Sequence, residues 1–140
     1  MFKLDTSTKF GARVAKRLED EQVIWLTTVR PDGIPQPNPV WFLWDGTSIL
    51  IYSQPQAKKV SHIRRNPHVA LHFNSTEDGS DVAIITGEAQ IEENAQRVDS
   101  NPVYIDKYKL GMADIGQSVD DMAREYSTII RVTPRHLRGF

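Results

Sequence analysis

Apolar residues in the first twenty positions recur every four residues, at Phe10, Val14 and Leu18. This spacing predicts one apolar stripe on a helix, and Ser7 or Thr8 is placed to cap its start. From position 22 to 30 the pattern changes to a dense run of β-branched and aromatic residues, which favours a buried strand. We therefore expect the chain to begin with a helix that lies against a sheet.

Arg30-Pro31-Asp32-Gly33 interrupts the apolar pattern and predicts a tight hairpin turn. Proline presets φ at the second position of a type I turn, and Gly33 accepts the left-handed conformation of an adjoining bulge. The returning strand opens with Pro35, Pro37 and Pro39, none of which has an N–H to donate. This strand is therefore expected at an edge or opening of the sheet, with backbone groups free for a ligand.

The remaining pattern predicts short strands joined by tight connections. The second strand is expected to continue from Val40 to Trp44 and to turn at Asp45-Gly46. Gly87 predicts a bulge or the close approach of another group in the fifth strand, and Pro134 is expected to end the sixth. The third to sixth strands are expected at 47–53, 69–73, 82–92 and 127–133.

Three further helices are expected outside the sheet. One spans 56–65, the next starts at Pro102 behind a Ser100 or Asn101 cap and ends at Gly111, and the last follows Ser118. Six strands in hairpin order with peripheral helices predict a mostly β fold, an antiparallel barrel in which closure removes exposed edges. An open sheet is the alternative, and residues 1–140 are expected to form one domain.

Composition and charge exclude several classes of protein. With 17 basic and 18 acidic residues, the net charge of −1 gives no field that would recruit nucleic acid or a membrane surface. The chain has no cysteine and no apolar run long enough to span a membrane, so we expect a cytoplasmic protein. The common dinucleotide, P-loop, hydrolase and zinc-protease motifs are absent from the sequence.

The candidate chemistry lies between Ser53 and Lys59. Ser53 ends a strand, and Lys58 and Lys59 stand in the opening turn of a helix, where free N–H groups and the helix dipole favour phosphate. A solvated basic face is the alternative. Aromatic residues around the hairpins can form either core or a platform for a flat ring: Trp25, Trp41, Trp44, Phe42 and Tyr52. The four histidines, His62, His68, His72 and His136, lack a second type of metal ligand, so no metal site is expected.

Several motifs, in their order, resemble one family. They are Thr28 to Pro35, Pro39-Val40-Trp41-Phe42, Lys58-Lys59-Val60, Asn66 to Leu71, and the final Val132-Thr133-Pro134 followed by Arg138-Gly139-Phe140. Together they resemble the FMN-binding split barrel related to pyridoxamine phosphate oxidase, and most of all its branch that uses the deazaflavin F-420. The resemblance covers nearly the whole chain, including Tyr104, Lys107-Tyr108 and Tyr126-Ser127.

This resemblance implies a six-stranded split barrel that binds F-420 or FMN at the interface of a homodimer. It implies an oxidoreductase that moves a hydride between the cofactor and an unknown small organic acceptor, with no catalytic residue assigned. Segments 36–38, 75–81 and 109–117 would line the substrate pocket. The cofactor ring and phosphate would be held by Asn38, Pro39, Val40, Trp41, Phe42, Ser53, Lys58 and Lys59.

Two departures from the family pattern point away from oxidation of pyridoxamine phosphate itself. The second strand lacks the usual arginine and lysine, and the C-terminal tryptophan and arginine segment is missing. A non-catalytic carrier of flavin or haem is the alternative function, with His68 or His72 as the haem ligand. An oligonucleotide-binding barrel would also use stacked aromatic residues, but the near-neutral charge argues against it.

Overall fold

A computed structural model describes residues 2–93 and 95–140. Its elements follow one another as α1 (Lys9–Asp20), β1 (Val23–Val29), β2 (Pro35–Trp41), β3 (Leu43–Trp44), β4 (Ile49–Ser53), α2 (Lys58–Arg65), β5 (His68–His72), β6 (Ala83–Glu92), the 3-10 turn η1 (Val98–Ser100), α3 (Pro102–Asp114), α4 (Val119–Glu125) and β7 (Thr128–Gly139). The described strands form one antiparallel sheet in the order β2-β1-β5-β6-β7-β4-β3. No helix among the described residues is long and apolar enough to cross a membrane.

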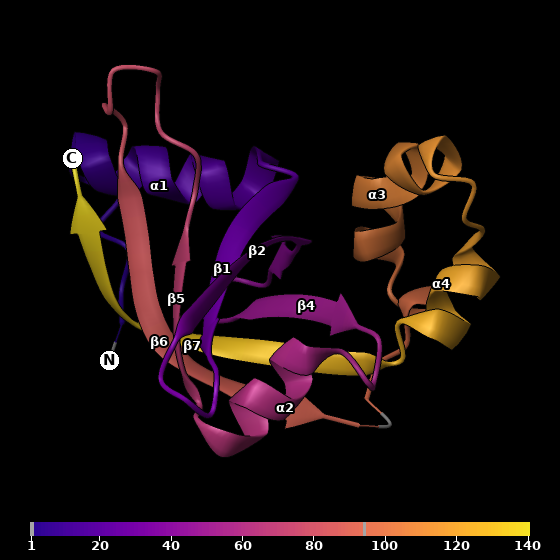
Figure 1. Ribbon diagram of the computed structural model, residues 1–140. Helices are drawn as coiled ribbons and strands as arrows, with labels where there is room; N and C mark the ends of the chain where they lie inside the picture. The colour runs from indigo at the N-terminus through magenta and orange to yellow at the C-terminus, as the bar shows by residue number, and fades with distance from the viewer. Residues whose placement is uncertain (1, 94) are drawn as a thin grey trace.

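The sheet curls into a partly closed barrel (Figure 1), which confirms the predicted fold class. Its two edges, β2 and β3, are neighbours in the chain and are separated only by Phe42. Side chains that point inward from the strands form the barrel core together with apolar residues of α1 and α2. The largest fully buried aliphatic side chains of this core are Leu18, Ile24, Leu26, Ile49, Ile51, Leu71, Ile85 and Ile130.

The local capping and turn predictions are confirmed. Thr8 caps α1, because its hydroxyl accepts a hydrogen bond from the Gly11 N–H at 2.9 Å. At the first hairpin the Gly33 N–H donates to the Arg30 carbonyl at 2.9 Å, and Gly33 has a φ of 86°. Glycine accepts this left-handed conformation without the steric cost that a Cβ would add.

The predicted second strand is interrupted at Phe42, so the sheet has seven strands and not six. Phe42 pairs with no strand: its N–H donates to the Tyr108 hydroxyl at 2.8 Å, and its carbonyl accepts from the Lys107 ammonium at 2.8 Å. Two side chains of α3 therefore satisfy the backbone groups that a neighbouring strand would otherwise satisfy. Because α3 supplies these hydrogen-bond partners, the chain can pass at Phe42 from one edge of the sheet to the other.

The expectation that Pro134 ends the last strand is wrong, because β7 continues to Gly139. The ladder between β6 and β7 shifts register at Thr86 and Gly87, and Pro134 lies opposite Gly87. A proline is tolerated at such a bulge because its missing N–H falls where the regular ladder is already broken. Gly87 is required there, since a Cβ would collide with the Thr133 carbonyl oxygen.

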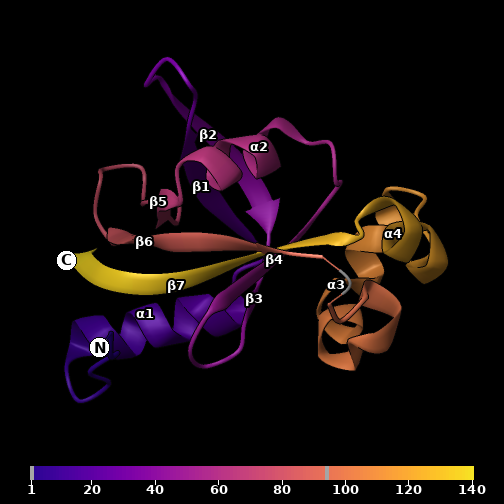
Figure 2. The same ribbon diagram turned by 90° about the horizontal axis from the view of Figure 1, so that it is seen from below.

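The helices occupy three separate places around the barrel. α1 and α2 lie on opposite sides of β6 and β7, whereas α3 and α4 lie together at one end of the barrel (Figure 2). We call the segment 102–125 the arm. The prediction that Gly111 ends α3 is wrong, because the helix continues to Asp114. A Cβ on Gly111 would lie 3.1 Å from the Trp41 ring, so this glycine lets the arm approach β2 closely.

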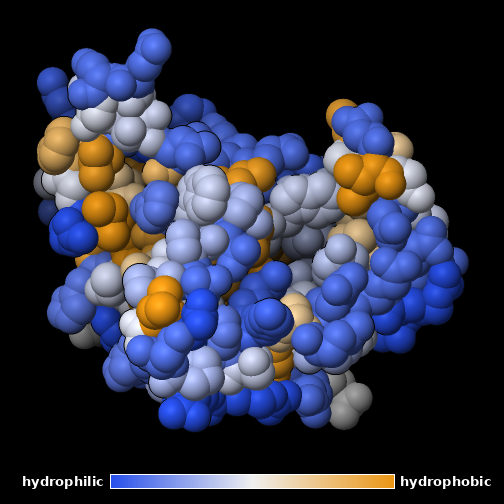
Figure 3. All heavy atoms as spheres, in the orientation of Figure 1, coloured by the Kyte–Doolittle hydropathy of each residue, from blue (hydrophilic) through white to orange (hydrophobic). Residues whose placement is uncertain are grey.

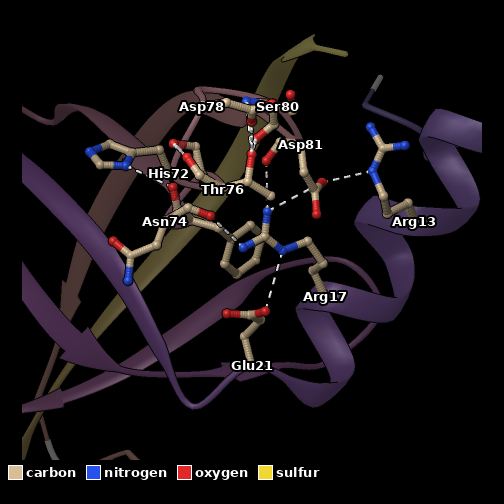
Figure 4. Close-up of polar contacts among 11 residues, drawn as sticks. Arg13, Arg17, Glu21, His72, Asn74, Thr76, Asp78, Ser80 and Asp81 are labelled. Atoms are coloured by element: carbon tan, nitrogen blue, oxygen red, sulfur yellow. Dashed lines mark hydrogen bonds and ion pairs between the residues drawn. The ribbon is translucent and has the colours of Figure 1, made fainter.

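Arg17 fixes the loop between β5 and β6 to α1 (Figure 4). Its guanidinium donates to the carbonyl oxygens of Asn74 at 2.7 Å and Asp81 at 3.0 Å, at the two ends of the loop. It also lies over the Phe73 ring, 4.7 Å from the centroid. Arg13 adds an ion pair with Asp81 at 2.7 Å. Both ends of the loop are therefore fixed to the same helix.

Candidate functional site

Helix α2 is held firmly against the barrel, which fixes the position of its N-terminal end. Val60 and Ile63 are buried in the barrel core. His62 is also buried, and its Nδ1 lies 2.9 Å from the hydroxyl oxygen of Thr28 on β1. The helix starts behind Ala57, whose side chain provides no cap, so its first N–H groups have no side-chain acceptor. An anion is favoured at such an end.

The three residues predicted to hold a phosphate gather around this connection but differ in exposure. Ser53 is 1% exposed and its hydroxyl donates to the Gln54 carbonyl at 3.0 Å. Lys58 is exposed and Lys59 is half-buried. Burial lowers the pKa of Lys59 below its ordinary value. Neither lysine forms an ion pair with a described residue, in contrast to Arg64 nearby, which pairs with Glu93 at 2.6 Å.

The residues predicted to hold a flat ring lie along an open edge of the sheet. β2 is an outermost strand, paired with β1 alone in a continuous ladder. Pro35, Pro37 and Pro39 occupy alternate positions of β2, so their backbone nitrogens, which carry no hydrogen, all face the same side of the strand. Because the ladder to β1 on the other side is intact, the prolines face the open edge. Asn38 and Pro39 are exposed, whereas Val40 is 8% exposed and Phe42 fully buried.

A cleft of about 250 Å³ lies between β2 and the arm, and we call it the arm cleft. Figure 3 shows this side of the molecule hollowed between the barrel and the arm. The nine lining residues come from β2, β4, α2, the arm and the residue that follows it, Tyr126: Pro39, Val40, Trp41, Tyr52, Lys59, Tyr104, Ile115, Met122 and Tyr126. The cleft thus brings together four of the eight predicted cofactor residues. Asn38, Phe42, Ser53 and Lys58 do not line it.

A row of packed aromatic rings forms the wall of the arm cleft. Trp41 stacks on Tyr108 with centroids 4.6 Å apart and planes 9° apart. Tyr104 packs against Tyr108 at 4.8 Å and against Tyr52 at 4.7 Å. The indole of Trp41 is therefore held in a fixed orientation by the arm while it lines the cleft. A ring fixed in this way is a suitable surface for a planar ligand.

The hydroxyls of these tyrosines differ in their partners. The Tyr52 hydroxyl donates to the Gln96 carbonyl at 2.8 Å and accepts from the Asn101 side chain at 3.1 Å. The Tyr108 hydroxyl donates to the Gln22 carbonyl at 2.6 Å and accepts from the Phe42 N–H. Burial raises the pKa of Tyr52 and of Tyr108, so both remain neutral near pH 7. These two hydroxyls are occupied by the fold itself.

The sequence did not single out the contribution of the arm to this site. No binding role was expected of Tyr104, Met122 or Tyr126, although the C-terminal family pattern includes both tyrosines. Of the three segments expected to line a substrate pocket, 109–117 contributes Ile115, although most of it is helical. Segment 75–81 lies beside α1, away from the arm (Figures 1 and 2).

The curled sheet, the open β2 edge and the flanking helices define a split barrel. A family profile described as pyridoxamine 5'-phosphate oxidase matches residues 10–139. The chain therefore belongs to the pyridoxamine 5'-phosphate oxidase family, as the sequence motifs indicated. No curated protein sequence matches this chain.

Several solved structures have the same fold. An F420 reductase is 25% identical, with a TM-score of 0.69, covering 88% of this chain and 94% of its own. A putative pyridoxamine 5'-phosphate oxidase from Listeria innocua is 26% identical, with a TM-score of 0.65 and coverages of 91% and 94%. The haem storage protein HutZ from Vibrio cholerae is 13% identical, with a TM-score of 0.64 and coverages of 99% and 95%, a likeness of fold alone.

Proposed function

We propose that this protein is an oxidoreductase that transfers a hydride between a bound flavin or deazaflavin F-420 and a small organic acceptor. The observation that carries this proposal is that Trp41 and Lys59 line the same cleft. A flat ring and an anionic group of one ligand would both find partners there. A bound flavin or deazaflavin supplies the hydride chemistry, and the protein supplies binding and orientation.

The side chains at the start of α2 suit the anionic part of such a cofactor. Lys58 and Lys59 are two cations without an ion-pair partner among the described residues, next to free N–H groups of a helix. A phosphate accepts hydrogen bonds from both kinds of donor. Ser53 stands at the end of the adjoining strand with a hydroxyl that can turn toward a phosphate. We therefore assign the phosphate to this corner and the ring to the β2 edge from Asn38 to Phe42.

Between the two cofactors, F-420 is favoured by charge. Its phosphate and glutamyl tail are both anionic, and Arg65 continues the basic face of α2 without an ion pair to a described residue. The similarity to an F420 reductase over most of both chains supports the same choice. FMN would place its phosphate at the same corner, and the two cofactors would differ only in the part of the molecule that extends beyond this phosphate.

Titration of FMN and of F-420 into ligand-free protein, followed by fluorescence, tests the proposal. We expect at least one of them to bind with a Kd below about 100 μM. Lys59→Gln should weaken that binding, and Lys16→Gln is the matched control because Lys16 is exposed and paired with Asp20 on α1. If neither cofactor binds the wild-type protein, the proposal is wrong. Oxidation of the reduced cofactor by an added acceptor then separates an enzyme from a carrier.

We further propose that a second copy of the chain completes the site, in a cytoplasmic homodimer. The arm cleft, at about 250 Å³, is smaller than the roughly 300–1,000 Å³ of a typical ligand pocket. The outer face of the sheet carries a groove of about 410 Å³ with Val29, Ala70 and Thr86 in its lining, a suitable surface for the second copy. Sedimentation velocity should show a dimer at micromolar concentration, and a monomer would contradict the shared site.

A non-catalytic haem carrier is the second candidate function. His68 and His136 both line the groove on the outer face of the sheet, so a planar haem there would have a ligand within reach. His72 is a poorer candidate because its Nδ1 lies 3.1 Å from the Phe73 carbonyl oxygen and its ring stacks on Trp25. The absorption spectrum of freshly purified protein distinguishes the candidates, since haem gives a Soret band and flavin does not.

A further inference from the structure

A pocket of about 640 Å³ lies between the N-terminal segment 2–6, α1, the turn that joins β3 to β4, and β7. We call it the turn pocket. Its volume falls within the roughly 300–1,000 Å³ of a typical ligand pocket, whereas the arm cleft is smaller. No described residue lines both, and the N-terminal segment lies away from the arm (Figures 1 and 2). The turn pocket is therefore separate from the candidate cofactor site.

The walls of the turn pocket are largely apolar and are fixed by the barrel. Leu4 and Trp44 pack against the barrel core, and Trp44 also pairs with Ile49 where β3 meets β4. Both side chains are half-buried, so part of their apolar surface is left for a ligand. The apolar lining residues are Phe2, Leu4, Ala15, Trp44 and Pro134. The two aromatic rings in this set suit a flat, apolar molecule.

The charged groups of the lining are all positive. Lys3 and Arg135 line the pocket, and no Asp or Glu is found among its described lining residues. Both side chains are exposed, so the two cations lie at the solvent side of the apolar walls. No described residue forms an ion pair with Lys3, and the ion pair of Arg135 with Glu88 is long, at 3.4 Å, and exposed. This distribution of charge favours an anionic ligand.

Two carboxylates that are close to this lining in the sequence have other partners. The Asp5 carboxylate accepts a hydrogen bond from the Ser7 N–H at 3.1 Å. Asp45 forms an ion pair with Arg131 at 3.1 Å, and it also accepts from the Ser48 N–H at 2.6 Å. These carboxylates are occupied by their own turns, so they leave Lys3 and Arg135 to a ligand.

We propose that the turn pocket binds a planar aromatic carboxylate. The ring packs against Trp44 and Phe2, and the carboxylate accepts hydrogen bonds from Arg135 and Lys3 at the solvent side. Burial of the ring supplies affinity, and the two cations select an anion over a neutral molecule of the same shape. This site does not depend on the proposed oxidoreductase function, because it shares no described residue with the arm cleft.

The probes 2-naphthoate and 2-naphthamide form a matched pair, since they share one planar shape and only the first is charged. Two-dimensional NMR spectra of the isotope-labelled protein follow the indole N–H signals of its three tryptophans. Trp44→Phe identifies the Trp44 signal. We expect 2-naphthoate to shift that signal with a Kd below about 1 mM. The amide should bind at least about 3-fold more weakly, because it lacks the charge.

Substitution of the two cations tests their role. Arg135→Gln should weaken 2-naphthoate binding about 3- to 10-fold and leave 2-naphthamide binding unchanged. Lys3→Gln should weaken it about 2-fold, since Lys3 is exposed. Lys3→Gln is the independent variant, because Arg135 also lines the groove proposed for a second copy and Lys3 does not. Lys16→Gln, outside the lining on α1, is the matched control and should change neither probe.

Several results would overturn the proposal. They are an unmoved Trp44 signal at about 1 mM 2-naphthoate, equal affinity for the amide, and unchanged 2-naphthoate binding in both Arg135→Gln and Lys3→Gln. A shift confined to the Trp41 signal would place the probe in the arm cleft and overturn it as well. Decahydro-2-naphthoate, the saturated counterpart, keeps the charge but is not flat. It should bind more weakly than 2-naphthoate, and equal binding would contradict the aromatic class.

The cofactor titrations remain a separate measurement. Arg135→Gln and Lys3→Gln should bind FMN and F-420 as the wild-type protein does, because neither residue lines the arm cleft. If the wild-type protein binds 2-naphthoate at Trp44 but binds neither cofactor, the oxidoreductase function fails and the turn pocket stands. If it binds a cofactor but 2-naphthoate leaves the Trp44 signal unmoved, the turn-pocket proposal is the one that fails.

Discussion

The interior of the barrel and the core beneath the arm are built from different side chains. The barrel core is almost entirely aliphatic, with Phe42 and Phe73 as its buried aromatic residues. The core beneath the arm instead contains three buried tyrosines and two methionines, and part of it opens into a cleft. Aliphatic side chains from neighbouring strands fill space without needing partners, whereas each buried phenol needs a hydrogen bond. Stability is therefore concentrated in the barrel and binding chemistry beneath the arm.

The largest expected effect tests the barrel side of this comparison. Leu71 is fully buried in the barrel core, so Leu71→Ala should lower the free energy of unfolding by about 2–5 kcal/mol. Ile34→Ala is the control, because Ile34 is 47% exposed and should change stability by less than about 0.5 kcal/mol. Urea unfolding at one fixed protein concentration measures both. Equal losses for the two variants would show that the barrel core does not dominate stability.

The next effect concerns the contact between the arm and the barrel. Tyr108→Phe keeps the ring that stacks on Trp41 but removes the hydroxyl bonded to Gln22 and Phe42. Two backbone groups then lose their partner, at a cost of about 1–3 kcal/mol. Tyr126→Phe should cost little, since that hydroxyl is not enclosed. The difference between the urea midpoints of Tyr108→Phe and Tyr126→Phe measures the effect. Equal midpoints would mean that water replaces the lost hydroxyl.

Lys107 should make the stability of this contact depend on pH. Burial lowers the pKa of Lys107 from 10.5 to about 8, although Glu19 and Asp20 act in the opposite direction. Between about pH 8 and pH 10.5 the unfolded chain binds more protons than the folded chain. The free energy of unfolding should therefore rise with pH, by at most about 1.4 kcal/mol per pH unit.

Urea titrations from about pH 7.5 to 9.5 measure this slope below the range in which tyrosines ionise, near pH 10. Lys107→Met removes the titrating group and should flatten the profile. Lys109→Met, on the exposed side of the same helix, should leave the slope as it is. A wild-type profile that does not rise would show that the ammonium is well solvated in the folded protein.

The smallest effect on stability is expected at Gly111. In Gly111→Ala, the gain of about 1 kcal/mol in helix propensity opposes the displacement of the Trp41 ring, 3.1 Å from the new Cβ. The net change in stability should stay within about 1 kcal/mol. The tryptophan emission maximum and cofactor affinity should nevertheless change, since the ring lines the cleft. Unchanged emission and affinity would show that Trp41 adjusts freely.

Features set by neighbours in sequence were predicted well. The Thr8 cap, the turn at Gly33, the bulge at Gly87 and the lysines that open α2 follow from local chemistry. The break at Phe42 was not predicted, because it depends on Tyr108, which is 66 positions away in the chain. No periodicity within one strand can reveal a partner supplied by a distant helix.

The same limit applies to the candidate site. Pro39 and Trp41 were named from family motifs and Lys59 also from its position at the start of a helix, and the structure brings them to one cleft. Tyr104 was not named for chemistry, because its spacing on α3 is that of any buried helical residue. Only the packed structure shows that Tyr104 lines the arm cleft while the hydroxyls of Tyr52 and Tyr108 are bonded to backbone carbonyls. The position of Pro134 was misjudged for a related reason, since its tolerance depends on Gly87 across the ladder.

The Arg17 guanidinium has a consequence for how this chain can vary in length. Arginine keeps its proton at any pH at which proteins fold, so its bonds to the Asn74 and Asp81 carbonyls are maintained. The loop between them is exposed and is fixed at both ends independently of its tip. Exposed tips of this kind tolerate inserted sequence. The turn near Gly79 is therefore a natural position for an epitope or a fluorescent reporter that leaves the barrel and the arm undisturbed.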